Sequence, residues 1–197
     1  TLGYALNRQD STERNTYTTR VDIDATERDS FNGVFSWVKN TALRSDADTT
    51  QFTTTPGVNQ FSLNKTFVMA YRRIFSSNIV NEVRGGIFMS EVPFDRTDPL
   101  PPFFFNSPAT TGTINSQLAA LLVTFPENTF LDQGRRNKSW NFQDNVDWIV
   151  GKHSFRFGGQ LQYFQVNTYN DAGTIPSYRL GTGPNTPAFT ANSNFAN

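Results

Sequence analysis

Few side chains in this sequence are of types that perform catalysis or bind metals, and they lack the partners that such chemistry needs. His153 is the only histidine, and the chain contains no cysteine. Neither a zinc site nor a Ser-His-Asp triad can be assembled around a single imidazole without a second base or ligand. We therefore predict no catalytic residue, no metal site and no cofactor, and we expect His153 to be a turn residue.

Two pairs of carboxylates have a spacing that could bind Ca²⁺. Asp22 and Asp24 share one face of an alternating run and could also act as an acid pair, whereas Asp46 and Asp48 lie in a polar loop. Loop carboxylates are the better cation candidates of the two pairs. The simpler interpretation of the first pair is that it lines a wall.

The elements that would position these residues are clearest in Trp140–Tyr163, where apolar and polar residues alternate on both sides of Gly151-Lys152. A Gly-X pair between two alternating runs indicates a β-hairpin with a two-residue type II′ turn. If Val150 faces His153, every other apolar pair also matches and Asp147 lies opposite Arg156, which favours this register. The predicted apolar pairs are Trp148–Phe155, Val146–Phe157, Phe142–Leu161 and Trp140–Tyr163, and Gln143–Gln160 is expected on the other face.

Alternation of the same kind predicts three hairpins, at residues 15–40, 59–91 and 138–166. The first turns at 27–29 and the second at 76–78, with Phe75 facing Ile79 and Arg72 facing Glu82. Residues 41–58, 92–137 and 167–197 are expected to be long loops, with one or two helical turns in Ile114–Val123. The fold class is therefore all-β, an antiparallel up-and-down meander of about six long strands.

Short turns at one end and long loops at the other are typical of an outer-membrane β-barrel, in which apolar side chains face lipid and polar ones face the lumen. The 28 aromatic residues (19 Phe, 6 Tyr and 3 Trp) support this interpretation, because many of them fall in two bands like interfacial girdles. A soluble carbohydrate-binding β-sandwich, with the apolar face as its core, is the alternative. The predicted lipid-facing girdle is Phe31, Trp37, Tyr71, Trp140, Trp148, Phe155 and Tyr163.

The opposite face carries mixed charge and amides that would hydrate a lumen. The predicted lumen-facing residues are Arg20, Asp22, Arg72, Glu82, Arg84, Asp147, Arg156 and Gln160. Aromatic rings on the loops either capture a ligand or pack the loops together. The candidate ligand-loop residues are Phe103, Phe104, Phe105, Tyr169 and Tyr178. Charge is balanced, with 17 basic and 17 acidic residues, so we expect no nucleic-acid partner.

Three blocks of the chain resemble strands of TonB-dependent outer-membrane receptors. They are RVDIDATERDSF at 20–31, FSSNIVNEVRGGI at 75–87 and FQDNVDWIVGKHSFRFGG at 142–159. The third block is the most specific, and the closest subset is the Oar-like receptors, which carry a carboxypeptidase-regulatory-like domain. The resemblance implies a barrel of ~22 strands in the outer membrane of a Gram-negative bacterium, with a plug inside it and energised uptake of a scarce ligand.

The plug domain, the TonB box and the regulatory domain have no counterpart in residues 1–197, so we expect an internal barrel segment. Its expected partners are outer-membrane lipid, its own plug domain and the TonB system outside this chain, and an unknown small ligand, glycan or peptide. A structural or adhesive surface barrel without energised transport is the alternative within the same fold.

Overall fold

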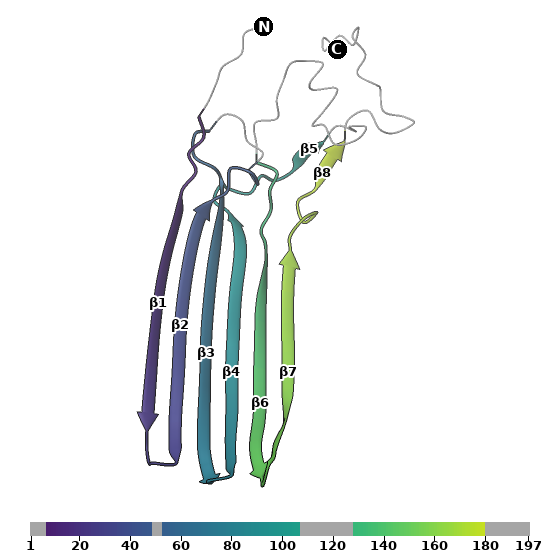
Figure 1. Ribbon diagram of the computed structural model, residues 1–197. Coiled ribbons are helices and arrows are strands. Elements are labelled where there is room, and N and C mark those ends of the chain that lie inside the picture. The colour runs from purple at the N-terminus through teal and green to yellow at the C-terminus, as the bar shows by residue number, and fades with distance from the viewer. Residues whose placement is uncertain (1–6, 49–52, 107–127, 180–197) are drawn as a thin grey trace, which may run out of the picture.

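The computed structural model describes residues 7–48, 53–106 and 128–179, and its main feature is one antiparallel sheet of six long strands (Figure 1). The strand order is β1-β2-β3-β4-β6-β7, so each long strand pairs with the next long strand in the chain. This is the predicted up-and-down meander. The strands are β1 (Thr12–Asp24), β2 (Asp29–Leu43), β3 (Val58–Ser76), β4 (Ile79–Arg96), β6 (Gln133–Val150) and β7 (His153–Asn170).

The strands extend further toward the long loops than the sequence pattern predicts. β4 continues to Arg96 and β6 begins at Gln133, inside the region expected to be loop. Cross-strand pairing continues through these ends, from Ser90 opposite Asn137 to Phe94 opposite Gln133. Backbone pairing does not require alternation of side chains, which explains why the pattern missed these ends. Strands of 13 to 19 residues exceed the ~9–11 that cross a bilayer, so their ends can project beyond it.

The predicted register of the last hairpin is confirmed at every pair. Trp148 lies opposite Phe155, Phe142 opposite Leu161, and Asp147 opposite Arg156. Gly151 adopts a φ of 59°, in the left-handed region that glycine enters without a steric penalty. The alternating pattern therefore fixed this register to the residue.

The other two turns differ from the prediction in detail. Ser76, and not Phe75, pairs with Ile79, because a bulge between Ile74 and Ser76 leaves Phe75 outside the ladder. Arg72 still lies opposite Glu82, as predicted. In the first hairpin the turn is formed by residues 25–28, and Asp29 already belongs to β2.

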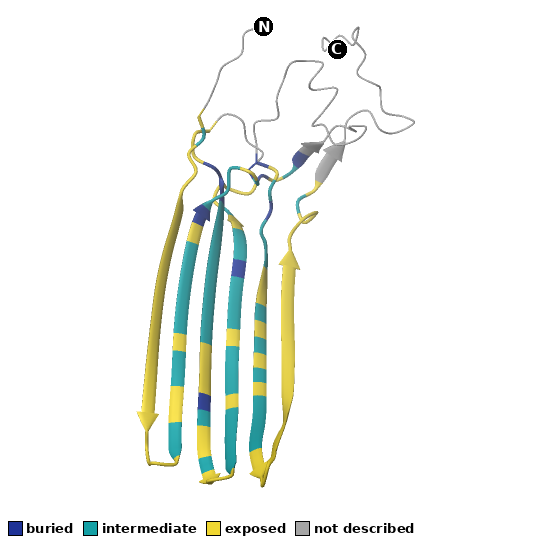
Figure 2. Ribbon diagram, in the orientation of Figure 1, coloured by how far each residue is buried: buried dark blue, intermediate teal, exposed yellow. Residues whose placement is uncertain are grey.

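The sheet has almost no core among the described residues (Figure 2). β1 and β7, the two outer strands, are exposed along their whole length, and the inner strands are mostly half-buried. No second layer covers either side of the long sheet in the part of the chain that the structure describes. Among these residues, no helix is long and apolar enough to cross a membrane.

A small two-stranded sheet lies beyond the long strands and was not predicted. β5 (Phe104–Asn106) pairs in parallel with β8 (Ser177–Arg179), which joins two long loops that are far apart in the sequence. Nearby, the Arg96 side chain donates to the carbonyl oxygens of Pro99 at 2.9 Å and of Phe130 at 3.3 Å. The predicted helical turns in Ile114–Val123 lie outside the described residues.

Candidate functional site

The two faces of the long sheet differ in chemistry, because paired residues in neighbouring strands point to the same side. One face carries Tyr17, Phe31, Tyr71, Trp148 and their cross-strand partners, and we call it the ring-bearing face. The other we call the charged face. It contains all eight of the predicted lumen-facing residues: Arg20, Asp22, Arg72, Glu82, Arg84, Asp147, Arg156 and Gln160.

Three ion pairs hold most of these charges. Arg20 donates two hydrogen bonds to Asp22, at 2.7 and 2.9 Å, and Arg156 donates to Asp147 at 2.6 Å. Glu82 accepts from Arg84 in its own strand, although Arg72 is its partner across the ladder. The predicted register therefore placed the charged residues on the correct face, but it did not predict that Glu82 forms its ion pair with Arg84 and not with Arg72.

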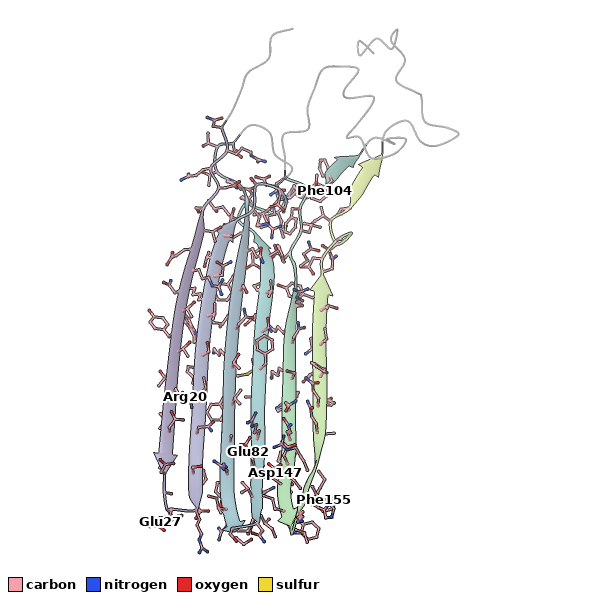
Figure 3. All side chains as sticks on the ribbon, viewed as in Figure 1. Arg20, Glu27, Glu82, Phe104, Asp147 and Phe155 are labelled. Atoms are coloured by element: carbon pink, nitrogen blue, oxygen red, sulfur yellow. The ribbon has the colours of Figure 1, made fainter. Side chains whose placement is uncertain are left out.

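The charges form a band that runs obliquely across the strands. Arg20 on β1 is connected by successive cross-strand pairs to Gly86 on β4. Glu82, a charged residue of β4, lies four residues closer to the short turns than Gly86. Figure 3 shows Arg20, Glu82 and Asp147 at successively lower positions from β1 to β6. Strands of a closed barrel tilt by about 35–45°, so a band with this slope would stay at nearly one depth in a membrane.

The rings of the opposite face form four cross-strand pairs. Near the short turns, Phe31 stacks on Tyr71 with centroids 4.6 Å apart, and Trp148 lies 5.8 Å from Phe155. Near the long loops, the other two pairs are Tyr17–Trp37 at 5.3 Å and Trp140–Tyr163 at 5.4 Å. All seven predicted girdle residues therefore take part in ring pairs on one face.

The two levels of rings slope in the same direction as the charged band. Cross-strand pairs connect Tyr71 on β3 to Asp144 on β6. The ring of β6 near the turns is Trp148, four residues closer to the turns than Asp144. In the same way, cross-strand pairs connect Trp37 on β2 to Lys138 on β6. Trp140, the ring of β6 near the long loops, lies two residues closer to the turns than Lys138. Rings and charges on opposite faces thus shift toward the short turns in the same direction across the sheet.

In both candidate carboxylate pairs, arginine side chains bind the carboxylates, and Arg20 is the one that binds Asp22. Arg44 lies 2.6 Å from Asp46, and Arg8 lies 2.7 Å from the fully buried Asp48 side chain. The hydrogen bond from Arg44 lowers the pKa of the Asp46 carboxyl to about 2. The residues that the structure describes contain no group of three or more His, Cys, Asp or Glu that could hold a metal ion.

The candidate ligand-loop rings differ in environment. Phe104 is only 9% exposed, which agrees with the alternative that this ring packs the loops together. Phe103 is half-buried, and Tyr169 remains 41% exposed. The side chains of Phe105 and Tyr178 lie outside the described residues, although their backbones are partners in the small sheet.

Sequence reasoning missed two polar features of the ring-bearing face. Asn81 donates to Asp144 there, although the alternation pattern predicts apolar residues. A groove beside Lys65 and Lys138 also opens on this face. Both are visible in the sequence only as exceptions to the alternation, and nothing in the pattern predicts that the exceptions on different strands meet.

A family model described as an outer membrane beta barrel domain matches residues 2–197, and the chain belongs to this family. No curated protein matches the sequence. Membership places the chain in the outer membrane of Gram-negative bacteria. It agrees with the six-stranded antiparallel meander and overturns the alternative of a soluble β-sandwich.

Proposed function

We propose that this outer membrane beta-barrel chain forms part of the wall of a TonB-dependent transport receptor of the Oar-like kind. Its ring-bearing face contacts lipid and its charged face lines a lumen. The receptor binds a scarce ligand at the long-loop end and imports it with energy from the TonB system. No catalytic step and no cofactor belong to this proposal.

The oblique band of ion pairs on the charged face is the observation that carries the proposal. Arg156 is 78% exposed and Asp147 43% exposed as side chains, so the pair meets solvent or another protein segment. On a lipid-facing surface, an arginine would cost about 2–4 kcal/mol at mid-depth, and a carboxylate or a charge nearer the interface would cost less. A hydrated lumen that also receives a plug suits such a wall, because mixed charges can exchange partners with the plug.

The two exposed outer strands support a larger barrel. β1 and β7 each pair on one side only, so each presents a row of unpaired backbone groups among the described residues. Open edges are unstable in lipid, which contains no water to satisfy them. We infer that further strands close the barrel, to the ~22 that the resemblance to TonB-dependent receptors implies.

Energised uptake tests the transport proposal directly. Cells that express the full-length protein should be compared with and without their TonB protein, using a panel of labelled iron chelates, cobalamin, oligosaccharides and peptides. The proposal predicts accumulation of one class of ligand that disappears when TonB is removed. Binding of a ligand at the cell surface with no TonB-dependent accumulation of any class would contradict it.

An adhesive or structural surface barrel is the second candidate, and the loop cluster favours it. Arg96 donates hydrogen bonds to four loop carbonyl groups, and Leu100 beside them is 62% exposed. A rigid loop platform with an exposed apolar residue suits contact with another surface. Cell–cell or cell–matrix adhesion that is unchanged in a strain without TonB would support this candidate.

A further inference from the structure

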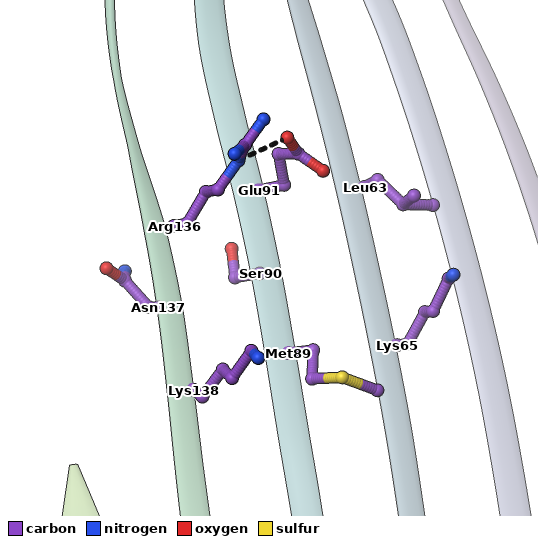
Figure 4. Close-up of a pocket in the computed structure, with 8 residues that line it drawn as sticks. All are labelled: Leu63, Lys65, Met89, Ser90, Glu91, Arg136, Asn137 and Lys138. Atoms are coloured by element: carbon purple, nitrogen blue, oxygen red, sulfur yellow. Dashed lines mark hydrogen bonds and ion pairs between the residues drawn. The ribbon is translucent and has the colours of Figure 1, made fainter. Parts of the chain in front are cut away.

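A groove on the ring-bearing face, at the end of the sheet near the long loops, combines cations with apolar side chains. It has a volume of about 150 Å³ and lies where β3, β4 and β6 run side by side (Figure 4). Leu63 and Met89 supply apolar surface, whereas Lys65, Arg136 and Lys138 supply three positive charges. Such a combination on one face is unusual for a lipid-facing wall and needs an explanation.

The cations are only partly neutralised. Glu91 is the one carboxylate that lines the groove, and Arg136 donates to it at 2.7 Å (Figure 4). In the part of the chain that the structure describes, no carboxylate lies within 4.0 Å of Lys65 or Lys138. Arg136 itself is 70% exposed as a side chain and keeps donors free to bind an additional anion. The groove therefore has an excess of positive charge.

The position of the cations matches the surface of a bilayer and not its centre. Lys65 and Lys138 lie in the same row of paired residues as Trp37, in the ring level near the long loops. Arg136 lies two residues further toward the loops than Lys138. A basic side chain is tolerated near the interface at a cost of about 0–1 kcal/mol, far below its cost at the midplane. The cations would then lie at the depth of lipid headgroups.

We propose that this groove binds a phosphorylated lipid of the outer leaflet. The headgroup phosphate contacts Lys65, Lys138 and Arg136 beside Leu63, and an acyl chain runs from Met89 along Phe67 and Ile87, the next apolar residues of this face toward the bilayer centre. Guanidinium and ammonium groups are the side chains that bind phosphate best. The short turns mark the periplasmic end of a barrel, so a groove at the opposite end meets the outer leaflet. The inference rests on the assignment of the ring-bearing face to lipid, and not on transport.

Binding of defined lipids to the full-length protein in nanodiscs tests the proposal. The probes are diphosphorylated lipid A, the same lipid with its phosphates removed, and inorganic phosphate. We expect the diphosphorylated lipid to bind well above the other two. The triple variant Lys65→Gln/Arg136→Gln/Lys138→Gln should bind it roughly hundredfold more weakly, because each basic residue near an anionic surface contributes about fivefold.

The control variant is Lys152→Gln, which removes a positive charge at the opposite end of the sheet and should leave lipid binding unchanged. Lys138→Gln alone changes one exposed side chain, and it should weaken binding about fivefold even if the triple variant does not fold. Equal binding of phosphorylated and dephosphorylated lipid, or unchanged binding by the folded variants, would overturn the proposal. The readout contains no uptake step, so a failure of the transport proposal leaves this result unaffected.

Discussion

Arg156 on β7 donates to Asp147 on β6 across 2.6 Å, and the next residue pair in the ladder, Trp148 and Phe155, points to the opposite face. One step along the hairpin thus changes the surface from an ion pair to a pair of aromatic rings. This reversal is a consequence of the two-residue period of a strand. It allows six strands to build a wall with a polar side and an apolar side.

The first prediction concerns the strength of that ion pair. Both side chains are well exposed, so the coupling free energy should be below about 1 kcal/mol. A double-mutant cycle with Arg156→Gln and Asp147→Asn, read out by urea unfolding of the full-length barrel in vesicles, measures it. A coupling of several kcal/mol would show that the pair is buried in the closed barrel, against this prediction.

The second prediction concerns adjacent glycines in β7. A Cβ at Gly158 would collide with the carbonyl oxygen of Asp144 on the neighbouring strand, whereas a Cβ at Gly159 meets open space. Gly158→Ala should destabilise the barrel by about 1–3 kcal/mol, as overpacking typically does. Gly159→Ala is the matched control and should change stability by less than about 0.5 kcal/mol. Equal effects of the two substitutions in the same unfolding assay would refute the close approach at Gly158.

The third prediction concerns Asp46, whose pKa is about 2 because Arg44 donates to it. A lowered pKa means that the ion pair stabilises the loop above the ordinary value of 3.8, and that this contribution is lost as the pH falls through about 2. Carboxyl-carbon NMR of the folded protein should show this low titration. Arg44→Gln should return the Asp46 pKa toward 3.8, whereas Arg28→Gln at the opposite end should not. An unchanged low pKa in Arg44→Gln would contradict the assignment.

The fourth prediction concerns the loop cluster around Arg96. Its side chain donates to the carbonyl oxygens of Asp98, Pro99, Asn128 and Phe130, and its backbone N–H donates to Asp132. Arg96→Ala should therefore speed amide hydrogen exchange in 97–104 and 128–132 while leaving the centre of the sheet protected. Arg135→Ala, in the next strand, is the control. Unchanged exchange in both loop segments would show that Arg96 does not hold them.

The sequence predicted the sheet better than the loops, for a physical reason. Alternation records which face of a strand each residue occupies, so it fixed the pairing of Asp147 with Arg156 without knowledge of the rest of the molecule. It could not show the bulge that leaves Phe75 unpaired, because a bulge depends on the backbone of the turn and not on polarity. The strand ends near Arg96 and Gln133 were also missed, since pairing there continues without an apolar face.

Among the candidate site residues too, the features that follow from alternation were predicted and those that depend on distant contacts were not. The eight residues of the charged face were predicted from parity alone, and all lie on one side. The burial of Phe104 and the cationic groove depend on contacts between segments far apart in the sequence. Lys65 and Lys138 each look like an isolated exception in its own strand, and only the register of β3, β4 and β6 brings them together.

The orientation of the two faces is the central claim, and collision-accessibility measurements on spin labels test it most directly. The chain has no cysteine, so single labels can be placed by Phe157→Cys, Val146→Cys, Gln160→Cys and Asn145→Cys in the full-length protein, once any cysteines elsewhere in it have been replaced. In vesicles, labels at 157 and 146 should relax preferentially with oxygen, which concentrates in lipid. Labels at 160 and 145 should relax preferentially with a water-soluble nickel chelate. The opposite pattern, with nickel reaching 157 and 146 and oxygen reaching 160 and 145, would contradict the account.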